Sequence, residues 1–399
     1  MSVELLAPPM LTAEEKQLIK SGGKYGIFQP QYKYPQSDAI DIERVHHFEI
    51  WAGNALQSAY FYREAYGFKL VAYAGPETGV RDRASYVLKQ GDVRLVLTTA
   101  LGPDSPIARH HLLHGDGVAL ISYRVADAKK AFETLVRNGA QPELEPTTIK
   151  DEFGEVTFAG IKAFGDTCYR LISDQNYRGP FLPGYQARHE PSRITAPGDL
   201  QFIDHIVTNV EDGRMEHWVD WYNKVFGFKL LATFDDQDIS TDYSSLRSQV
   251  MSSQNGVVKM PVNEPAPGLI KSQIQEYIDY YHTPGVQHIA IHTDDILASI
   301  KRMKNAGVEF LYVPDSYYED LIGRVGVIDE DVEALAKLGI LVDRDDRGYL
   351  LQLFTKPVED RPTLFFEIIQ RKGAISFGKG NFKALFVSIE EEQRRRGNT

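Results

Sequence analysis

Two histidines and one glutamate, far apart in the chain, occupy positions from which their side chains could bind a metal ion. His205 lies in FIDHIVTNV, His288 in GVQHIAIHT and Glu367 in TLFFEIIQR. Alternating or continuous apolar residues in these segments are typical of buried strands. A carboxylate in such a strand is costly unless a cation or hydrogen-bond donors compensate its charge. Two imidazoles and one carboxylate form the ligand set of non-haem Fe(II) sites, which leave further positions open.

Each of these residues also has a simpler interpretation. A single histidine in a strand is usually a core or surface residue. A buried glutamate can pair with an arginine, here Arg361 or Arg371. His292 shares a strand face with His288 and is a second candidate ligand. The metal interpretation is favoured because the candidates occur together, at equivalent positions of an internal repeat.

A second group of histidines occurs in RHHLLH, residues 109–114. His110 and His114 lie at positions i and i+4. The segment lacks the glutamate of an HExxH zinc motif. We therefore expect a solvated loop or helix here.

The strands that carry the candidate ligands belong to two copies of one pattern. Residues 46–75 are similar to 204–236, and residues 115–140 are similar to 283–308. Each copy reads as a strand, a helix that ends at a glycine, two hairpin strands, and a further strand with an amphipathic helix. This predicts an α+β fold of two tandem units, each a half-open curved sheet of paired βαβββ motifs. The organisation resembles that of the vicinal oxygen chelate superfamily.

The two copies differ at the candidate ligand positions. In the first copy His205, His288 and Glu367 are matched, in this order, by His47, Leu120 and Leu171. One histidine cannot hold a metal tightly. The first copy is therefore expected to be a structural partner, and the second to carry the site.

We divide the chain at the changes in pattern. The parts are an N-terminal extension (1–40), a first vicinal oxygen chelate domain without metal (41–177), a linker (178–198) and a second, catalytic, iron-binding domain with a C-terminal helix (199–399). The linker is rich in glycine, proline and arginine, which predicts an exposed connection.

Bulk composition limits the function classes. The 399 residues carry a net charge of −11 without a basic stripe, which argues against nucleic-acid or membrane-surface binding. The single cysteine, Cys168, excludes an intramolecular disulfide framework. The sequence shows neither a secretion signal nor a run of about 18 apolar residues, so we expect no transmembrane helix and a cytoplasmic location.

Several motifs in combination resemble one family. GVQHIA, DRPTLFFEIIQR, GYLLQLFTKP, PVNEP and FGKGNFKALFVSIEEEQ are similar to segments of 4-hydroxyphenylpyruvate dioxygenases. The resemblance covers nearly the whole chain and is strongest from about residue 200 to 397. It implies the conversion of 4-hydroxyphenylpyruvate and O2 to homogentisate and CO2 in tyrosine and phenylalanine catabolism. The steps would be oxidative decarboxylation, ring hydroxylation and side-chain migration.

The resemblance also implies the site. One Fe(II) per chain would be held by His205, His288 and Glu367, with the 2-oxo acid of the substrate chelated to it. Substrate-binding positions match Ser248, Pro261, Asn263, Gln273, Gln287, Gln352, Phe354, Phe365, Phe377 and Phe382. Many family members form homodimers or homotetramers, which is the expectation here.

The C-terminal segment predicts a cover for this site. Phe382, Leu385, Phe386 and Ile389 form one apolar helical stripe. Glycines before the stripe could act as a hinge, so the helix is expected to close over the second-domain site and exclude water. A static core helix is the alternative.

Three other functions share parts of the pattern. 4-Hydroxymandelate synthase has the same fold, ligands and substrate but oxidises the benzylic carbon, and Pro261, Asn263 and Phe354 favour ring oxidation instead. A ring-cleaving extradiol dioxygenase would act on catechols without releasing CO2. A metal-free small-molecule binding protein would have no need for a buried carboxylate such as Glu367.

Overall fold

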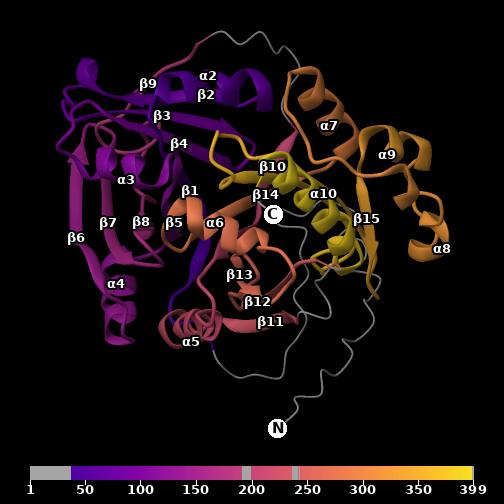
Figure 1. The fold of residues 1–399 in the computed structure, drawn as a ribbon. Helices are drawn as coiled ribbons and strands as arrows, with labels where there is room; N and C mark the ends of the chain where they lie inside the picture. The colour runs from indigo at the N-terminus through magenta and orange to yellow at the C-terminus, as the bar shows by residue number, and fades with distance from the viewer. Residues whose placement is uncertain (1–36, 191–198, 236–240, 242, 398–399) are drawn as a thin grey trace.

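The structure of the protein is a computed structural model that describes residues 37–190, 199–235, 241 and 243–397 (Figure 1). These residues form two curled sheets, one from each half of the chain, with helices packed on them. The tandem α+β architecture predicted from the repeat is confirmed. The N-terminal extension expected for 1–40 lies outside the described residues, apart from 37–40.

The first half of the chain forms a nine-stranded sheet. Its elements are β1 (Ile42–Trp51), α2 (Ala55–Tyr66), β2 (Lys69–Ala74), β3 (Arg83–Gln90), β4 (Val93–Ala100), α3 (Pro106–His114), β5 (Gly117–Val125), α4 (Ala128–Arg137), β6 (Pro142–Asp151), β7 (Gly154–Lys162), β8 (Cys168–Ser173) and β9 (Gln186–Ala187). The strand order is β6-β7-β8-β5-β1-β4-β3-β2-β9. β1 pairs parallel with β4 and antiparallel with β5, and β5 pairs parallel with β8.

The second half repeats this arrangement in an eight-stranded sheet. Its elements are β10 (Leu200–Asn209), α5 (Met215–Phe226), β11 (Lys229–Phe234), β12 (Ser245–Ser252), β13 (Lys259–Ala266), α6 (Gln273–Tyr281), β14 (Gly285–Thr293), α7 (Ile296–Asn305), α8 (Leu321–Val325), α9 (Val332–Leu338), β15 (Leu341–Arg344), β16 (Tyr349–Phe354), β17 (Phe365–Lys372) and α10 (Phe382–Arg395). The order β11-β12-β13-β10-β14-β17-β16-β15 places β10 between β13 and β14, as β1 lies between β4 and β5.

The helix that follows the first strand ends in the same way in both copies. Gly67 ends α2 with φ 82° and Gly227 ends α5 with φ 73°. This left-handed conformation is available to glycine without a steric penalty, and it lets the backbone N–H reach carbonyls of the last turn. The chain can then turn directly into β2 or β11.

Strand pairing corrects one predicted equivalence. Glu367 lies opposite the residue two positions after His288. In the first sheet, Arg170 lies opposite Ser122, the residue two positions after Leu120. The predicted match to Leu171 is therefore wrong by one residue, because the strand register of the first sheet places Arg170 at the position of Glu367. Arg170 is a cation and cannot ligate a metal.

The linker is not an exposed connection over its first part, contrary to the prediction for 178–198. Phe181 and Leu182 are buried in a small core on the face of the first sheet that carries His47. The Phe181 ring centroid lies 5.1 Å from that of His47. β9 then pairs with β2, so residues 186–187 add an edge strand. The apolar side chains between the glycines and prolines bury surface, which outweighs the turn-forming composition.

The histidine-rich segment 109–114 forms the end of α3, which Ser105 caps through Ala108 N and in which Pro106 occupies the first turn. The expected solvated character is wrong for His110 and His114, whose side chains are buried. Of the three histidines in this segment, only His111 is solvated, with 44% of its side chain exposed.

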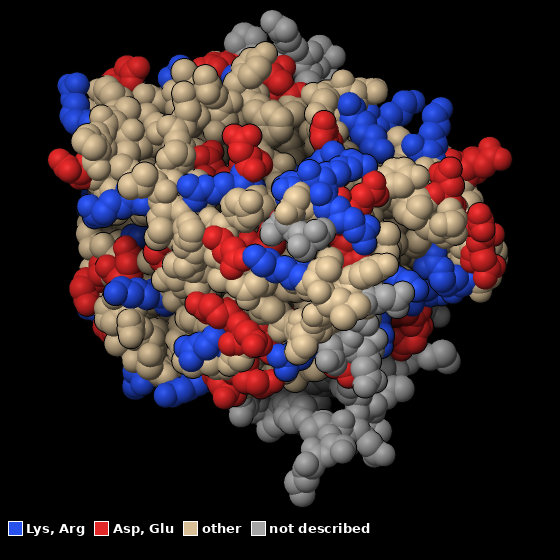
Figure 2. All heavy atoms as spheres, viewed as in Figure 1, with Lys and Arg blue, Asp and Glu red and all other residues tan. Residues whose placement is uncertain are grey.

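The surface of the described residues carries both charges. Figure 2 shows basic and acidic side chains interspersed over the face that it presents. Among the described residues, no helix combines the length and apolar character needed to cross a membrane.

Phe181 provides a test of the packed linker. Phe181→Ala should lower the free energy of unfolding by about 3 kcal/mol, because a buried aromatic ring leaves a cavity on the inner face of the first sheet. Chemical denaturation measures this loss. Phe153→Ala is the control, since 43% of Phe153 is exposed. Equal effects of the two substitutions would contradict the buried role of Phe181.

Candidate active site

Three residues on neighbouring strands bring their ligand atoms together in the second sheet. β10 carries His205, β14 carries His288 and β17 carries Glu367. Glu367 Oε2 lies 3.2 Å from His205 Nε2 and 3.4 Å from His288 Nε2, and all three side chains are buried. Ligand atoms bound to one metal at about 2.1 Å lie roughly 3 Å apart, so this spacing suits a metal site.

The second nitrogen of each imidazole is held by an oxygen. His205 Nδ1 lies 2.8 Å from Asp204 Oδ1, and His288 Nδ1 lies 2.9 Å from Gln287 Oε1. Because these oxygens accept, each Nδ1–H donates, and each Nε2 of a neutral ring directs a lone pair towards Glu367. Metal-binding histidines are typically fixed in this way. The residues therefore fit a divalent metal ion.

The charges in this cluster depend on one another. Burial opposes the ionised form of Glu367, but His205 and His288 outweigh it and lower the pKa of Glu367 to about 2. Burial likewise opposes the protonation of His205, yet the Glu367 and Asp204 carboxylates raise its pKa. Glu367 is therefore ionised at neutral pH and offers a charged oxygen to a cation.

A cavity of 70 Å³ opens from the ligand atoms between the second sheet and α10. Its wall is largely aromatic and aliphatic, with a few polar side chains that converge on it, as in pockets for small ligands. It contains the three candidate ligands and Val207, Phe234, Leu246, Ser248, Val250, Pro261, Asn263, Gln273, Gln287, Phe354, Phe365, Phe377, Phe382, Leu385 and Phe386.

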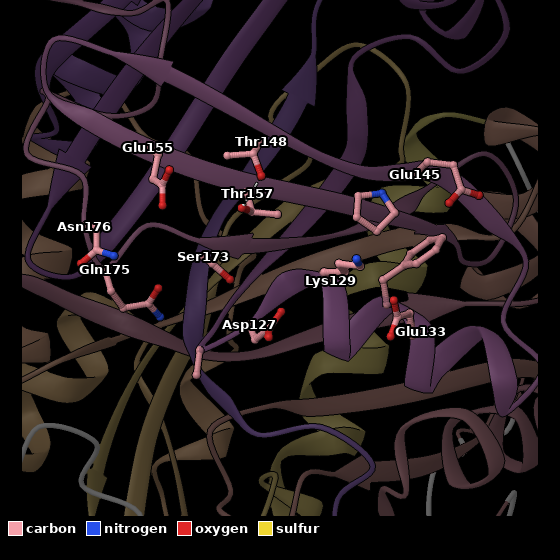
Figure 3. Close-up of a pocket in the computed structure, with 13 residues that line it drawn as sticks. Asp127, Lys129, Glu133, Glu145, Thr148, Glu155, Thr157, Ser173, Gln175 and Asn176 are labelled. Carbon is pink, nitrogen blue, oxygen red and sulfur yellow. Dashed lines mark hydrogen bonds between the residues drawn. The ribbon is translucent and has the colours of Figure 1, made fainter.

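A larger cavity of 690 Å³ lies in the first domain, between α4 and the sheet (Figure 3). Asp127, Glu133, Glu145 and Glu155 line it together with Lys129 and several hydroxyl and amide side chains. Its lining residues include no histidine or cysteine, and the carboxylates do not form a cluster that could hold a metal. Size alone therefore does not identify the reactive site.

Sequence comparison places the chain among known proteins. A sequence model of the Glyoxalase/Bleomycin resistance protein/Dioxygenase superfamily matches residues 44–167 and 202–353. The 4-hydroxyphenylpyruvate dioxygenase of Dictyostelium discoideum is 46% identical over 366 residues, which are 90% of this chain and 100% of that protein. The enzyme of the same name from Xenopus tropicalis is 46% identical over 362 residues, 88% of this chain and 92% of that one. The chain belongs to the 4-hydroxyphenylpyruvate dioxygenase family.

Two solved structures resemble this fold. A triply substituted 4-hydroxymandelate synthase from Streptomyces coelicolor superimposes with a TM-score of 0.78 at 30% identity, covering 88% of this chain and 99% of the synthase. A fusion protein of a xylose isomerase-like TIM barrel and a 4-hydroxyphenylpyruvate dioxygenase has a TM-score of 0.68 at 23% identity, over 95% of this chain and 56% of the fusion. The second comparison supports the fold alone.

In this member of the dioxygenase family, the other candidate ligand and the two arginines that could pair with Glu367 lie outside the ligand cluster. His292 stacks on Phe202, with ring centroids 4.6 Å apart, and it is not part of the ligand cluster. Arg371 pairs with Asp204, and Arg361 donates to backbone carbonyls of Leu113 and Tyr280. Neither arginine pairs with Glu367, so the polar contacts of its side chain among the described residues are the two imidazole nitrogens at 3.2 and 3.4 Å.

Sequence reasoning missed Asp204. Arg371 Nε lies 2.7 Å and Nη2 lies 2.9 Å from the two Asp204 oxygens, and Lys259 Nζ lies 3.5 Å from Oδ1. Burial alone would raise the pKa of Asp204, but the two cations hold it well below its ordinary value. The β10–β14 register is irregular between Ile203 and His205. This irregularity accompanies the contact between the adjacent side chains of Asp204 and His205. A charged residue inside an apolar strand is the signal that could have identified Asp204.

Nine of the ten predicted substrate-binding residues line the cavity, and Gln352 does not. Gln352 is buried, and its amide atoms have no hydrogen-bond partner among the described residues. Its side chain lies against Gly378, where an added Cβ would come within 2.5 Å of Nε2. A role of Gln352 in substrate binding stays a prediction.

Asp204→Asn tests the orientation of His205. The neutral amide should weaken metal affinity by about 10- to 100-fold, because it no longer fixes the charge and tautomer of the imidazole. Competition with a chelator at constant pH measures the affinity. Asp212→Asn is the matched control, since 73% of the Asp212 side chain is exposed. Unchanged affinity in Asp204→Asn would rule out this role.

Proposed function

We propose that the protein converts 4-hydroxyphenylpyruvate and O2 to homogentisate and CO2. The observation that carries the proposal is the His205–His288–Glu367 cluster at the base of an aromatic cavity. Relatives at 43–46% identity over about nine-tenths of the chain carry the name of this activity. The family assignment and the chemistry of the donor set therefore support the same reaction.

Fe(II) is the metal that we propose for the cluster. His205, His288 and Glu367 would hold it, as expected of two imidazoles and one carboxylate. When bound, it supplies the redox chemistry and the coordination sites with which the 2-oxo acid and O2 react. Burial of the ligands keeps bulk water away from these positions.

The aromatic residues of the cavity have a positioning role in this proposal. Phe365 stacks on His288 with ring centroids 4.8 Å apart, and Phe377 meets His205 edge-on at 5.2 Å. Phe354 completes the wall beside His288 at 5.9 Å. A flat phenyl ring gains stacking and edge contacts with such side chains. They would direct the ring of the substrate towards the metal position.

Polar side chains in the cavity suit the phenol hydroxyl of the substrate. Ser248 and Asn263 lie opposite each other on β12 and β13, so their side chains share a face of the sheet. Gln273, the first residue of α6, also lines the cavity. A hydroxyl and two amides can both donate to and accept from a phenol. We assign these residues to ring recognition.

Helix α10 covers the cavity with Phe382, Leu385 and Phe386. Its later turns are anchored, since Glu390 Oε1 lies 2.5 Å from Ser244 Oγ and Arg396 lies 2.8 Å from Glu276. Since the start of α10 forms one wall of the cavity, its displacement would open the site to an aromatic 2-oxo acid, which supports a lid role for this part of the helix.

Three features of the proposal stay predictions of the sequence: the homodimeric or homotetrameric state, the cytoplasmic location and the domain limits at 177 and 199. They do not enter the catalytic argument.

The ligand cluster is tested by single substitutions. Glu367→Gln and His288→Ala should each lose stoichiometric iron, and turnover should fall by at least about 100-fold, more than the loss of an outer-shell partner causes. Elemental analysis and oxygen consumption measure the two effects. His292→Ala is the control, because His292 lies on the same strand outside the cluster. Full iron content in both variants would rule out the cluster as the iron site.

Product analysis separates the dioxygenase from 4-hydroxymandelate synthase. Incubation of the iron-loaded protein with 4-hydroxyphenylpyruvate and O2 should give homogentisate, because Pro261, Asn263 and Phe354 would hold the ring towards the metal. Chromatography with mass detection identifies the product. Hydroxymandelate as the main product would contradict ring oxidation.

A further inference from the structure

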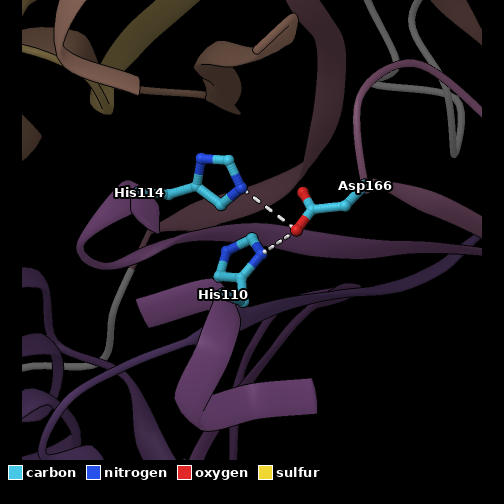
Figure 4. A group of neighbouring side chains, drawn as sticks. All are labelled: His110, His114 and Asp166. Carbon is cyan, nitrogen blue, oxygen red and sulfur yellow. Dashed lines mark hydrogen bonds and ion pairs between the residues drawn. The ribbon is translucent and has the colours of Figure 1, made fainter. Parts of the chain in front are cut away.

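A second cluster of two histidines and one carboxylate lies outside the active site (Figure 4). His110 and His114 occupy successive turns of α3, and Asp166 lies in the loop between β7 and β8. His110 Nδ1 and His114 Nε2 each lie 3.0 Å from Asp166 Oδ2. In the active site the corresponding distances from the glutamate oxygen are 3.2 and 3.4 Å. The two clusters thus share one arrangement, in which two ring nitrogens converge on a single carboxylate oxygen.

The hydrogen bonds of His114 leave a lone pair directed at Asp166. His114 Nδ1 contacts the backbone carbonyl of Tyr281, which can only accept, so this nitrogen carries the hydrogen. In the neutral ring, Nε2 is then an acceptor that faces a second acceptor, the Asp166 carboxylate. A cation between them would satisfy both atoms. Ligating histidines typically donate their other N–H to a carbonyl in this way.

His110 presents a related imbalance. The ring is buried, and Nε2 has no hydrogen-bond partner within the described part of the chain. Its polar contact is the one between Nδ1 and Asp166. If Nε2 carries the hydrogen, as ligation through Nδ1 requires, the lone pair on Nδ1 points at the same carboxylate oxygen. In this tautomer, both rings direct lone pairs to one point.

The surroundings fix the rings and leave one side open. His114 stacks on Tyr281 with ring centroids 4.2 Å apart, and Trp51 meets His110 edge-on at 5.2 Å. Asp166 has 45% of its side chain exposed and lies, with His114, on the wall of a cavity of 430 Å³. An ion can enter from this cavity, and a water molecule can take the remaining position.

We propose that His110, His114 and Asp166 form a second metal site, which binds Zn²⁺ or a similar divalent first-row ion and ties α3 to the loop between β7 and β8. Two imidazoles, one carboxylate and a water are a common four-coordinate set for Zn²⁺. The site belongs to the first domain, but its ring His114 is held by Tyr281 at the end of α6 in the second domain. A bound ion fixes α3 against the loop that carries Asp166 and holds the His114 ring in contact with Tyr281, a structural role that involves no step of the reaction.

Metal stoichiometry tests the proposal on the intact chain. After removal of metals with a chelator and dialysis against Zn²⁺, the protein should retain two equivalents by elemental analysis. Asp166→Asn and Glu367→Gln should each retain one, and the double variant should retain none. Asp166→Asn should keep its Fe(II)-dependent turnover, which shows that it is folded. His111→Ala, on the same helix with an exposed ring, should keep both equivalents.

Thermal denaturation in the Glu367→Gln background isolates the second site. Zn²⁺ should raise the melting temperature of this variant and should have no effect once Asp166→Asn is added, because ligands stabilise only the state that binds them. The proposal is overturned if the unsubstituted protein retains a single equivalent, as an imidazolium–carboxylate pair would require. It is also overturned if Asp166→Asn retains two.

Discussion

The second domain depends on one expensive arrangement, an ionised glutamate buried against two imidazoles. Removing the Glu367 carboxylate from water is unfavourable, and the charge is tolerated only because His205 and His288 meet it at 3.2 and 3.4 Å. That geometry requires β10, β14 and β17 to lie side by side in a fixed register. The strand order of the sheet is therefore also the condition for the chemistry. The same requirement includes Asp204, which contacts the His205 imidazole. Arg371 and Lys259 in turn pair with Asp204.

The duplicated fold shows what happens when this arrangement is absent. The first sheet has the same strand pairing, but an arginine stands where the second has its glutamate. The space that a ligand would occupy is filled by Phe181 and its apolar neighbours, which pack on the remaining histidine. Burial of these side chains stabilises the first sheet as a closed unit. One copy uses its inner face for packing and the other uses it for binding.

Sequence patterns predicted the elements and the ligands better than their surroundings. The position of His205, His288 and Glu367 on inward strand faces followed from strand periodicity, and the family resemblance named all three together with nine residues that line the cavity. Asp204 was missed because its contact with His205 goes with a local register shift, which periodicity does not reveal. Three other features depend on pairings between distant segments. They are the equivalence of Arg170 to Glu367, the burial of Phe181 and the burial of His110. Such pairings are set by the whole fold, and no local pattern encodes them.

The position of α10 has a consequence for the folding of the protein. The helix begins at Phe382 and supplies the last wall of the cavity, while its anchor at Glu390 reaches back to Ser244. The three ligand positions and most of the pocket lie earlier in the chain. Any order of folding in which both sheets form before α10 docks leaves the candidate site open on the side that α10 covers. Docking of this last helix then encloses the cavity.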